Sequence, residues 1–127
     1  MDTRQKIIEP HRALALAQDL RAKGVKIVTG YFDVLVAEHV RRLREIKNGC
    51  AVLVVVVLDP PEPVLDARAR AELVAALGVV DYVVPAGEQA ARELLSHFAP
   101  SEIVREESAD LLRASRLSEH VKRRQQQ

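Results

Sequence analysis

The stretch that decides the fold is Ala51-Val52-Leu53-Val54-Val55-Val56-Val57-Leu58, which contains no polar side chain. A half-buried strand alternates apolar and polar residues, whereas a strand covered on both faces is apolar throughout. The stretch is also too short to cross a bilayer as a helix. Asp59-Pro60-Pro61-Glu62-Pro63 ends it, because proline lacks the backbone donor that a strand ladder requires. The stretch therefore predicts a central strand of a parallel sheet.

Three further strands are predicted, one before this stretch in the sequence and two after it. Val25 to Thr29 and Val79 to Val84 are rich in β-branched residues, and they end at Gly30 and Pro85. Glu102 to Arg105 is predicted to form a short fourth strand.

Apolar residues recur at helical spacing in the segments between these strands. The predicted helices run from Pro10 to the stop at Gly24, from Val36 to Lys47, from Asp66 to Leu77, from Gly87 to Phe98 and from Ser108 to about Arg123. In the third helix, the residues predicted to face the core are Ala69, Leu73, Ala76 and Leu77. Because strands alternate with helices, the sequence predicts an α/β fold. We expect a single domain over residues 1–127, with helices on both faces of a parallel sheet.

The composition argues against several classes of protein. With 19 basic and 18 acidic residues, the chain as a whole gives no reason to expect nucleic-acid or membrane binding. Cys50 is the only cysteine, so an intrachain disulfide and a cysteine-rich zinc site are excluded. The first residues lack the apolar stretch of a secretory signal, and we expect a cytoplasmic protein. Lys122-Arg123-Arg124 is interpreted as a solvated helix end, with a basic nucleic-acid tail as the less favoured alternative.

The candidate site lies where the predicted strands end. In open α/β sheets, ligands bind at the carboxyl ends of the strands, near the point where the strand order reverses. Here these ends are Gly30 to Asp33, Asp59 to Pro63, Pro85 to Glu88 and Arg105 to Glu107.

The first of these ends carries a family resemblance. Residues 26–40 read Lys-Ile-Val-Thr-Gly-Tyr-Phe-Asp-Val-Leu-Val-Ala-Glu-His-Val. This resembles the signature of the cytidylyltransferase-like nucleotidyltransferases, in which a strand runs into Gly-x-Phe-Asp-x-x-His-x-Gly-His. Gly30, Phe32, Asp33 and His39 fall on family positions. Val80-Asp81-Tyr82-Val83-Val84 is similar to a second family segment, and the likeness is greatest to the nucleotidyltransferase domain of heptose-phosphate enzymes of lipopolysaccharide core synthesis.

The resemblance implies a Rossmann-like fold and a nucleoside triphosphate site. Proteins of this family transfer a nucleotidyl group from CTP or ATP to a phosphorylated sugar or alcohol and release pyrophosphate, usually with Mg²⁺. By this resemblance His39 is the candidate catalytic residue, and a homodimer is expected. The candidate nucleotide-binding residues are Gly30, Tyr31, Phe32, Asp33, Asp59 and Arg70. No cluster of histidines and carboxylates has metal-ligand spacing, so Mg²⁺ would enter with the nucleotide.

The sequence departs from the family at several points of the site. Val36 stands in place of the first histidine, and its side chain has no hydrogen-bond donor for phosphate. Glu38 replaces a glycine, and its negative charge opposes the binding of a negatively charged triphosphate. The loop from Asp59 to Pro63 lacks the lysine-bearing insertion of the heptose-type relatives, and Arg105-Glu106-Glu107 replaces a Lys-Gly pair. The family's Ser-Thr-rich motif is not recognisable, and Ser108 is at most a remnant of it.

These departures leave three hypotheses open. The first is a divergent nucleotidyltransferase, the second a catalytically inactive nucleotide-binding pseudoenzyme, and the third an oligomeric interaction protein on the same fold. Individual residues also have structural alternatives. Asp33 is favoured as a cap of backbone amides, Asp59 is a turn residue or a ribose ligand, and Arg70 is a phosphate ligand or a solvated helix arginine.

Overall fold

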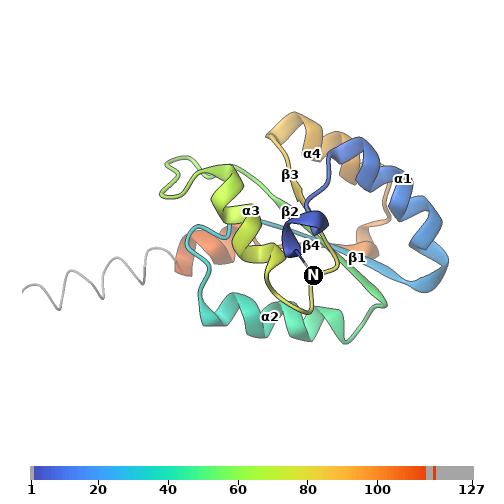
Figure 1. Ribbon diagram of the computed structural model, residues 1–127, viewed down its shortest axis with the longest axis horizontal. Coiled ribbons are helices and arrows are strands. Elements are labelled where there is room, and N and C mark those ends of the chain that lie inside the picture. The colour runs from blue at the N-terminus through green and yellow to red at the C-terminus, as the bar shows by residue number, and fades with distance from the viewer. Residues whose placement is uncertain (1, 114–115, 117–127) are drawn as a thin grey trace, which may run out of the picture.

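The computed structural model describes residues 2–113 and 116, and these residues form a parallel sheet between helices (Figure 1). The strands are β1 (Val25–Gly30), β2 (Val52–Val57), β3 (Tyr82–Pro85) and β4 (Ile103–Arg105). The α-helices are α1 (Pro10–Leu20), α2 (Ala37–Lys47), α3 (Ala67–Ala75) and α4 (Glu88–Leu95), with 3-10 turns η1 (Thr3–Lys6), η2 (Arg21–Lys23) and η3 (Pro100–Glu102). The predicted α/β fold is confirmed.

The strand order places the switch point of the sheet between β1 and β4. The order is β3-β2-β1-β4, and every pair is parallel, so the chain first moves from β1 to β3 and then returns to the other side of β1. Strand β2 lies between β1 and β3, and Leu53 to Val57 are all buried. The prediction of a central strand from the apolar stretch is therefore confirmed.

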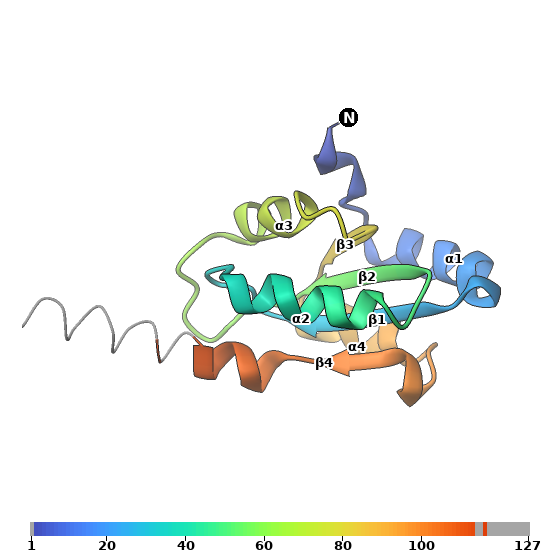
Figure 2. The same cartoon turned by 90° about the horizontal axis from the view of Figure 1, so that it is seen from below.

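The sheet has a separate core on each face. Helices α1 and α4 pack against Val54 and Val56 on one face, whereas α2 and α3 pack against Val55 and Val57 on the other. Figure 2 shows the sheet between these helices. Successive residues of a strand point to opposite faces, so the all-apolar β2 supplies both cores at once.

Two predicted details of the elements are wrong. Helix α3 buries Arg70, Ala71, Val74 and Ala75, while Leu73 of the predicted apolar stripe is exposed. The helix turns its arginine inward, and apolar spacing cannot indicate a buried charged residue. Strand β3 begins at Tyr82 rather than Val79, because residues 79–81 are still part of the connection from α3, although Val80 is buried.

The last predicted helix is described only in its first part. Residues 107–113 are helical, and residues 114–115 and 117–127 lie outside the described residues. The predicted apolar positions Ala114, Leu117 and Val121 and the basic end of the chain fall in that part. No helix within the described residues is long and apolar enough to cross a membrane.

Candidate functional site

The backbone just after β1 forms an anion site. The amide nitrogens of Tyr31 and Phe32 lie 2.7 Å and 3.3 Å from the same carboxylate oxygen, Oδ2 of Asp110. Phe32 has a φ of 51°, in the left-handed region that residues other than glycine seldom adopt. This turn aims consecutive amides at one point, which is the arrangement of an anion-binding nest.

Gly30 is the residue that allows the carboxylate to come so close. A Cβ atom at position 30 would lie 2.5 Å from Oδ2 of Asp110 and 2.8 Å from Cε2 of Phe32. Both distances are shorter than real Cβ contacts. The absence of a side chain at this position therefore makes room for the anion, as glycine does wherever a ligand must approach the backbone.

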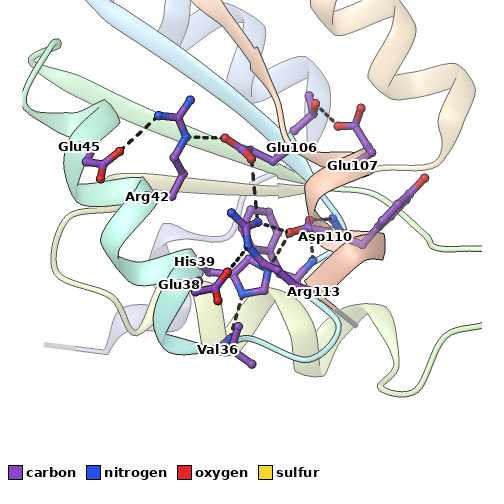
Figure 3. Close-up of polar contacts among 12 residues, drawn as sticks. Val36, Glu38, His39, Arg42, Glu45, Glu106, Glu107, Asp110 and Arg113 are labelled. Carbon is purple, nitrogen blue, oxygen red and sulfur yellow. Dashed lines mark hydrogen bonds and ion pairs between the residues drawn. The ribbon is translucent and has the colours of Figure 1, made fainter. Parts of the chain in front are cut away.

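His39 belongs to the cage around the same carboxylate (Figure 3). Its Nδ1 accepts a hydrogen bond from the backbone amide of Val36 at 2.9 Å, which satisfies a free amide at the start of α2. Because Nδ1 is an acceptor, the ring proton lies on Nε2, which donates to Oδ1 of Asp110 at 2.6 Å. The side chain is 3% exposed, so both ring nitrogens are engaged inside the protein.

Arginine and glutamate side chains surround this buried pair. Arg113 donates to Oδ1 of Asp110 at 3.1 Å and to Glu38 at 3.3 Å. Arg42 of α2 donates to Glu106 at 2.7 Å, and this hydrogen bond raises the pKa of Arg42. Figure 3 shows these contacts between α2 and residues 106–113. Glu38, which replaces the family's glycine, is thus paired with a cation.

Asp33 fastens the β1 exit to the loop before α3. Its carboxylate accepts hydrogen bonds from the amides of Val64 at 2.7 Å and Leu65 at 3.0 Å. The prediction that Asp33 caps backbone amides is confirmed, although the amides belong to a distant loop rather than to its own turn.

Arg70 is buried, with 1% of its side chain exposed. Its guanidinium donates to the carbonyl oxygens of Leu65, Tyr31 and Leu58 at 3.1, 3.3 and 2.6 Å, and to Oδ1 of Asp59 at 2.9 Å. It therefore joins the exits of β1 and β2 to α3. The interpretation of Arg70 as a solvated helix residue is wrong, and its donors serve the backbone in this structure.

A cleft of about 730 Å³ opens at the carboxyl edge of the sheet, beside the switch point. Its lining comes from the exits of β1, β2 and β4 and from α4, and consists of Tyr31, Leu58, Asp59, Pro61, Glu88, Ala91, Arg92, Leu95, Ser96, Arg105 and Glu107. Tyr31 belongs to both places. It lines the cleft, and its backbone amide forms part of the anion site. A ligand in the cleft would therefore lie next to the anion site.

The structure brings together only some of the predicted site residues. Tyr31 and Asp59 line the cleft, whereas Gly30, Phe32 and His39 surround the carboxylate of Asp110. The remaining two, Asp33 and Arg70, hold the loops around them.

Sequence reasoning missed the residue at the centre of the arrangement, Asp110. A signal was nevertheless present in the sequence. Glu106, Asp110 and Arg113 are spaced four and three residues apart, which puts them on one face of a helix, while Leu111 and Leu112 lie beside that face.

Three carboxylates are among the residues that line the cleft. Asp59, Glu88 and Glu107 offer the oxygen ligands that Mg²⁺ prefers. Within residues 2–113 and 116, no three histidine, cysteine, aspartate or glutamate side chains converge closely enough to hold an ion.

No family model matches the chain, but comparisons with individual proteins do find relatives. The chain is 34% identical over 102 residues, 72% of its length, to the bifunctional protein HldE of Hydrogenovibrio crunogenus. It is 33% identical over 115 residues, 82% of its length, to HldE of Vibrio parahaemolyticus. The chain covers only 21% and 24% of these two relatives.

The fold has a counterpart among solved structures. The crystal structure of the lipopolysaccharide core biosynthesis protein from Thermoplasma volcanium matches with a TM-score of 0.54 and 23% identity, over 65% of this chain and 95% of that one. The fold predicted from the resemblance is thus confirmed. The chain is a relative of one part of the HldE proteins, and its resemblance to the cytidylyltransferase-like nucleotidyltransferases is confirmed.

Proposed function

We propose that this chain is a divergent nucleotidyltransferase that transfers a nucleotidyl group from CTP or ATP to a phosphorylated sugar or alcohol. The observation that carries the proposal is the pair of convergent amides at Tyr31 and Phe32, which hold an anion at the end of β1 beside the cleft. The relationship to HldE proteins supports the same class of reaction.

The residues suggest a division of labour during transfer. The amides after β1 would hold phosphate oxygens, and Arg92 and Arg105 would add positive charge from the cleft wall. Asp59, which is 62% exposed, has a free face for a ribose hydroxyl. The acceptor's phosphate oxygen would attack the α-phosphorus, and the bond to the bridging oxygen would break with pyrophosphate leaving as the anion. Mg²⁺ bound with the nucleotide would offset the charge of the phosphates.

A second candidate function is nucleotide binding without transfer. Two observations favour it. Val36 offers no side-chain donor at the position of the family's first histidine, and both nitrogens of His39 are already engaged. Losing one preorganised donor costs roughly a hundred- to a thousandfold in rate. On this alternative the cleft still binds CTP or ATP, but turnover is absent.

Calorimetric titration with CTP and ATP, with and without Mg²⁺, tests both candidates. Saturable binding followed by pyrophosphate release with a sugar or alcohol phosphate supports the enzyme, and binding without release supports the second candidate. Arg105→Ala should weaken binding roughly ten- to a hundredfold, because a hydrogen bond to a charged group contributes roughly 1.5–3 kcal/mol. Arg68→Ala on the exposed side of α3 is the matched control and should leave affinity unchanged. No heat from a folded sample at millimolar nucleotide contradicts both.

A further inference from the structure

The carboxylate of Asp110 occupies a site whose donors come mostly from other parts of the fold. Four groups donate to it: the amides of Tyr31 and Phe32, Nε2 of His39 and the guanidinium of Arg113. Only Arg113 belongs to the same helical segment as Asp110. If that segment moves away, two amides and an imidazole N–H remain aimed at an empty place large enough for an anion.

Polar contacts hold this segment, residues 107–113, to the body of the protein. Thr29 donates its hydroxyl to Glu107, Arg113 pairs with Glu38, and Asp110 fills the anion site. By contrast Leu111 and Leu112 are 48% and 52% exposed, and neither core cluster includes a described residue of the segment. Because no apolar side chain of the segment enters either core, the segment can leave without opening the cores, and the lost polar contacts are the cost of its departure.

We propose that residues 107–113 form an internal plug, in which Asp110 takes the place of a phosphate group and must leave before a phosphate-bearing ligand binds. A phosphate offers three acceptor oxygens, so it can meet the two amides and the imidazole N–H at once. The biological role of the plug rests on the proposed function, since it would keep the triphosphate site closed until substrate displaces it. The anion site itself is testable without any turnover.

Inorganic pyrophosphate is the probe, and Asp110→Ala and Asp110→Asn are the test variants. Asp110→Ala should bind pyrophosphate at least tenfold more tightly than the original protein in calorimetry. It should also melt at a lower temperature without ligand, because four donors lose their acceptor, and pyrophosphate should restore part of that loss. Asp110→Asn keeps the shape but not the charge and should gain less. Glu45→Gln removes one charge from the neighbouring face of α2 without contacting the segment, and its affinity should not change.

Several results would overturn the plug. If Asp110→Ala folds and binds pyrophosphate no better than Glu45→Gln, the amides are not a phosphate site. Should Asp110→Ala fail to fold, amide exchange in the original protein decides the matter: saturating pyrophosphate must speed exchange in residues 107–113, and unchanged exchange refutes displacement. If the Asp110 variants bind pyrophosphate more tightly but the protein binds no nucleotide, only the proposed function is refuted. If the protein turns over nucleotide but the Asp110 variants bind pyrophosphate no more tightly, only the plug is refuted.

Discussion

Arg70 shows how a single side chain can hold the site together without touching a ligand. Three of its four hydrogen bonds reach the ends of two strands, the fourth reaches the loop before α3, and a lysine cannot reproduce this planar fork. We expect Arg70→Lys to lower the free energy of unfolding by about 3 kcal/mol, because buried carbonyls lose a charged donor. Urea unfolding measures the change.

The control for this prediction lies on the same helix. Arg68 is 59% exposed and pairs with Glu72 on the surface, so Arg68→Lys should change stability by less than about 0.5 kcal/mol. If the two substitutions lowered the free energy of unfolding equally, the buried guanidinium of Arg70 would contribute nothing to stability.

Residue-level roles were the least predictable feature of the chain. Gly30 and Phe32 could be placed from the family motif, because the motif describes a local backbone turn. The spacing of Glu106, Asp110 and Arg113 puts them on one face of a helix, but it does not show that Asp110 is buried, and the burial of Arg70 has no such signal, since both contact the distant Tyr31. A helical pattern assigns charged residues to solvent, and only the assembled fold reveals donors or acceptors that satisfy them inside.

At the scale of elements, strands and most helices followed from local signals. Strand β2 is an unbroken apolar run, and α1 begins at Pro10, a residue suited to the first turn of a helix. The inward face of α3 was predicted wrongly because its buried set includes an arginine and three small or β-branched residues, which give a weak apolar pattern. Packing against the sheet decided that face.

The attachment of residues 107–113 leads to a prediction about salt. Raising NaCl from 50 to 500 mM should speed amide exchange in this segment about fivefold, because screening removes roughly 1 kcal/mol from the pairs at Arg42 and Arg113. Helix α4 is the internal control. It is attached through buried Ala91, Leu94 and Leu95, and its exchange should stay constant. A parallel change in both helices would mean that salt acts on global stability and not on the segment.

At the scale of the whole molecule, the two-sided arrangement was predictable, since alternating strands and helices leave few other solutions. The position of the anion site relative to the cleft was not, because it depends on how the last helix meets the first strand. This contact joins residues that lie far apart in the sequence, and local sequence patterns do not predict it.

The two cores should respond separately to mutation. Val55 and Val56 face opposite sides of the sheet, and Val83 is the strand partner of Val55 on the same side. Each valine-to-alanine change should cost about 2 kcal/mol. We expect the losses in unfolding free energy from Val55→Ala and Val56→Ala to add within about 0.5 kcal/mol in the double variant. The losses from Val55→Ala and Val83→Ala should deviate from additivity by more. Denaturant titration of the singles and doubles provides the comparison, and strict additivity of both pairs would contradict this coupling.

The place of β4 beside β1 also sets an order of events during synthesis. A chain emerges from the ribosome with its N-terminus first, so β1, β2 and β3 can pair before residues 103–105 exist. Until then the outer edge of β1 has unpaired backbone groups that can attract another strand. When Ile103 finally pairs with Ile27, Asp110 follows a few residues later and reaches the turn after Gly30. The edge of β1 and the anion site beside it are therefore completed by the same late part of the described chain.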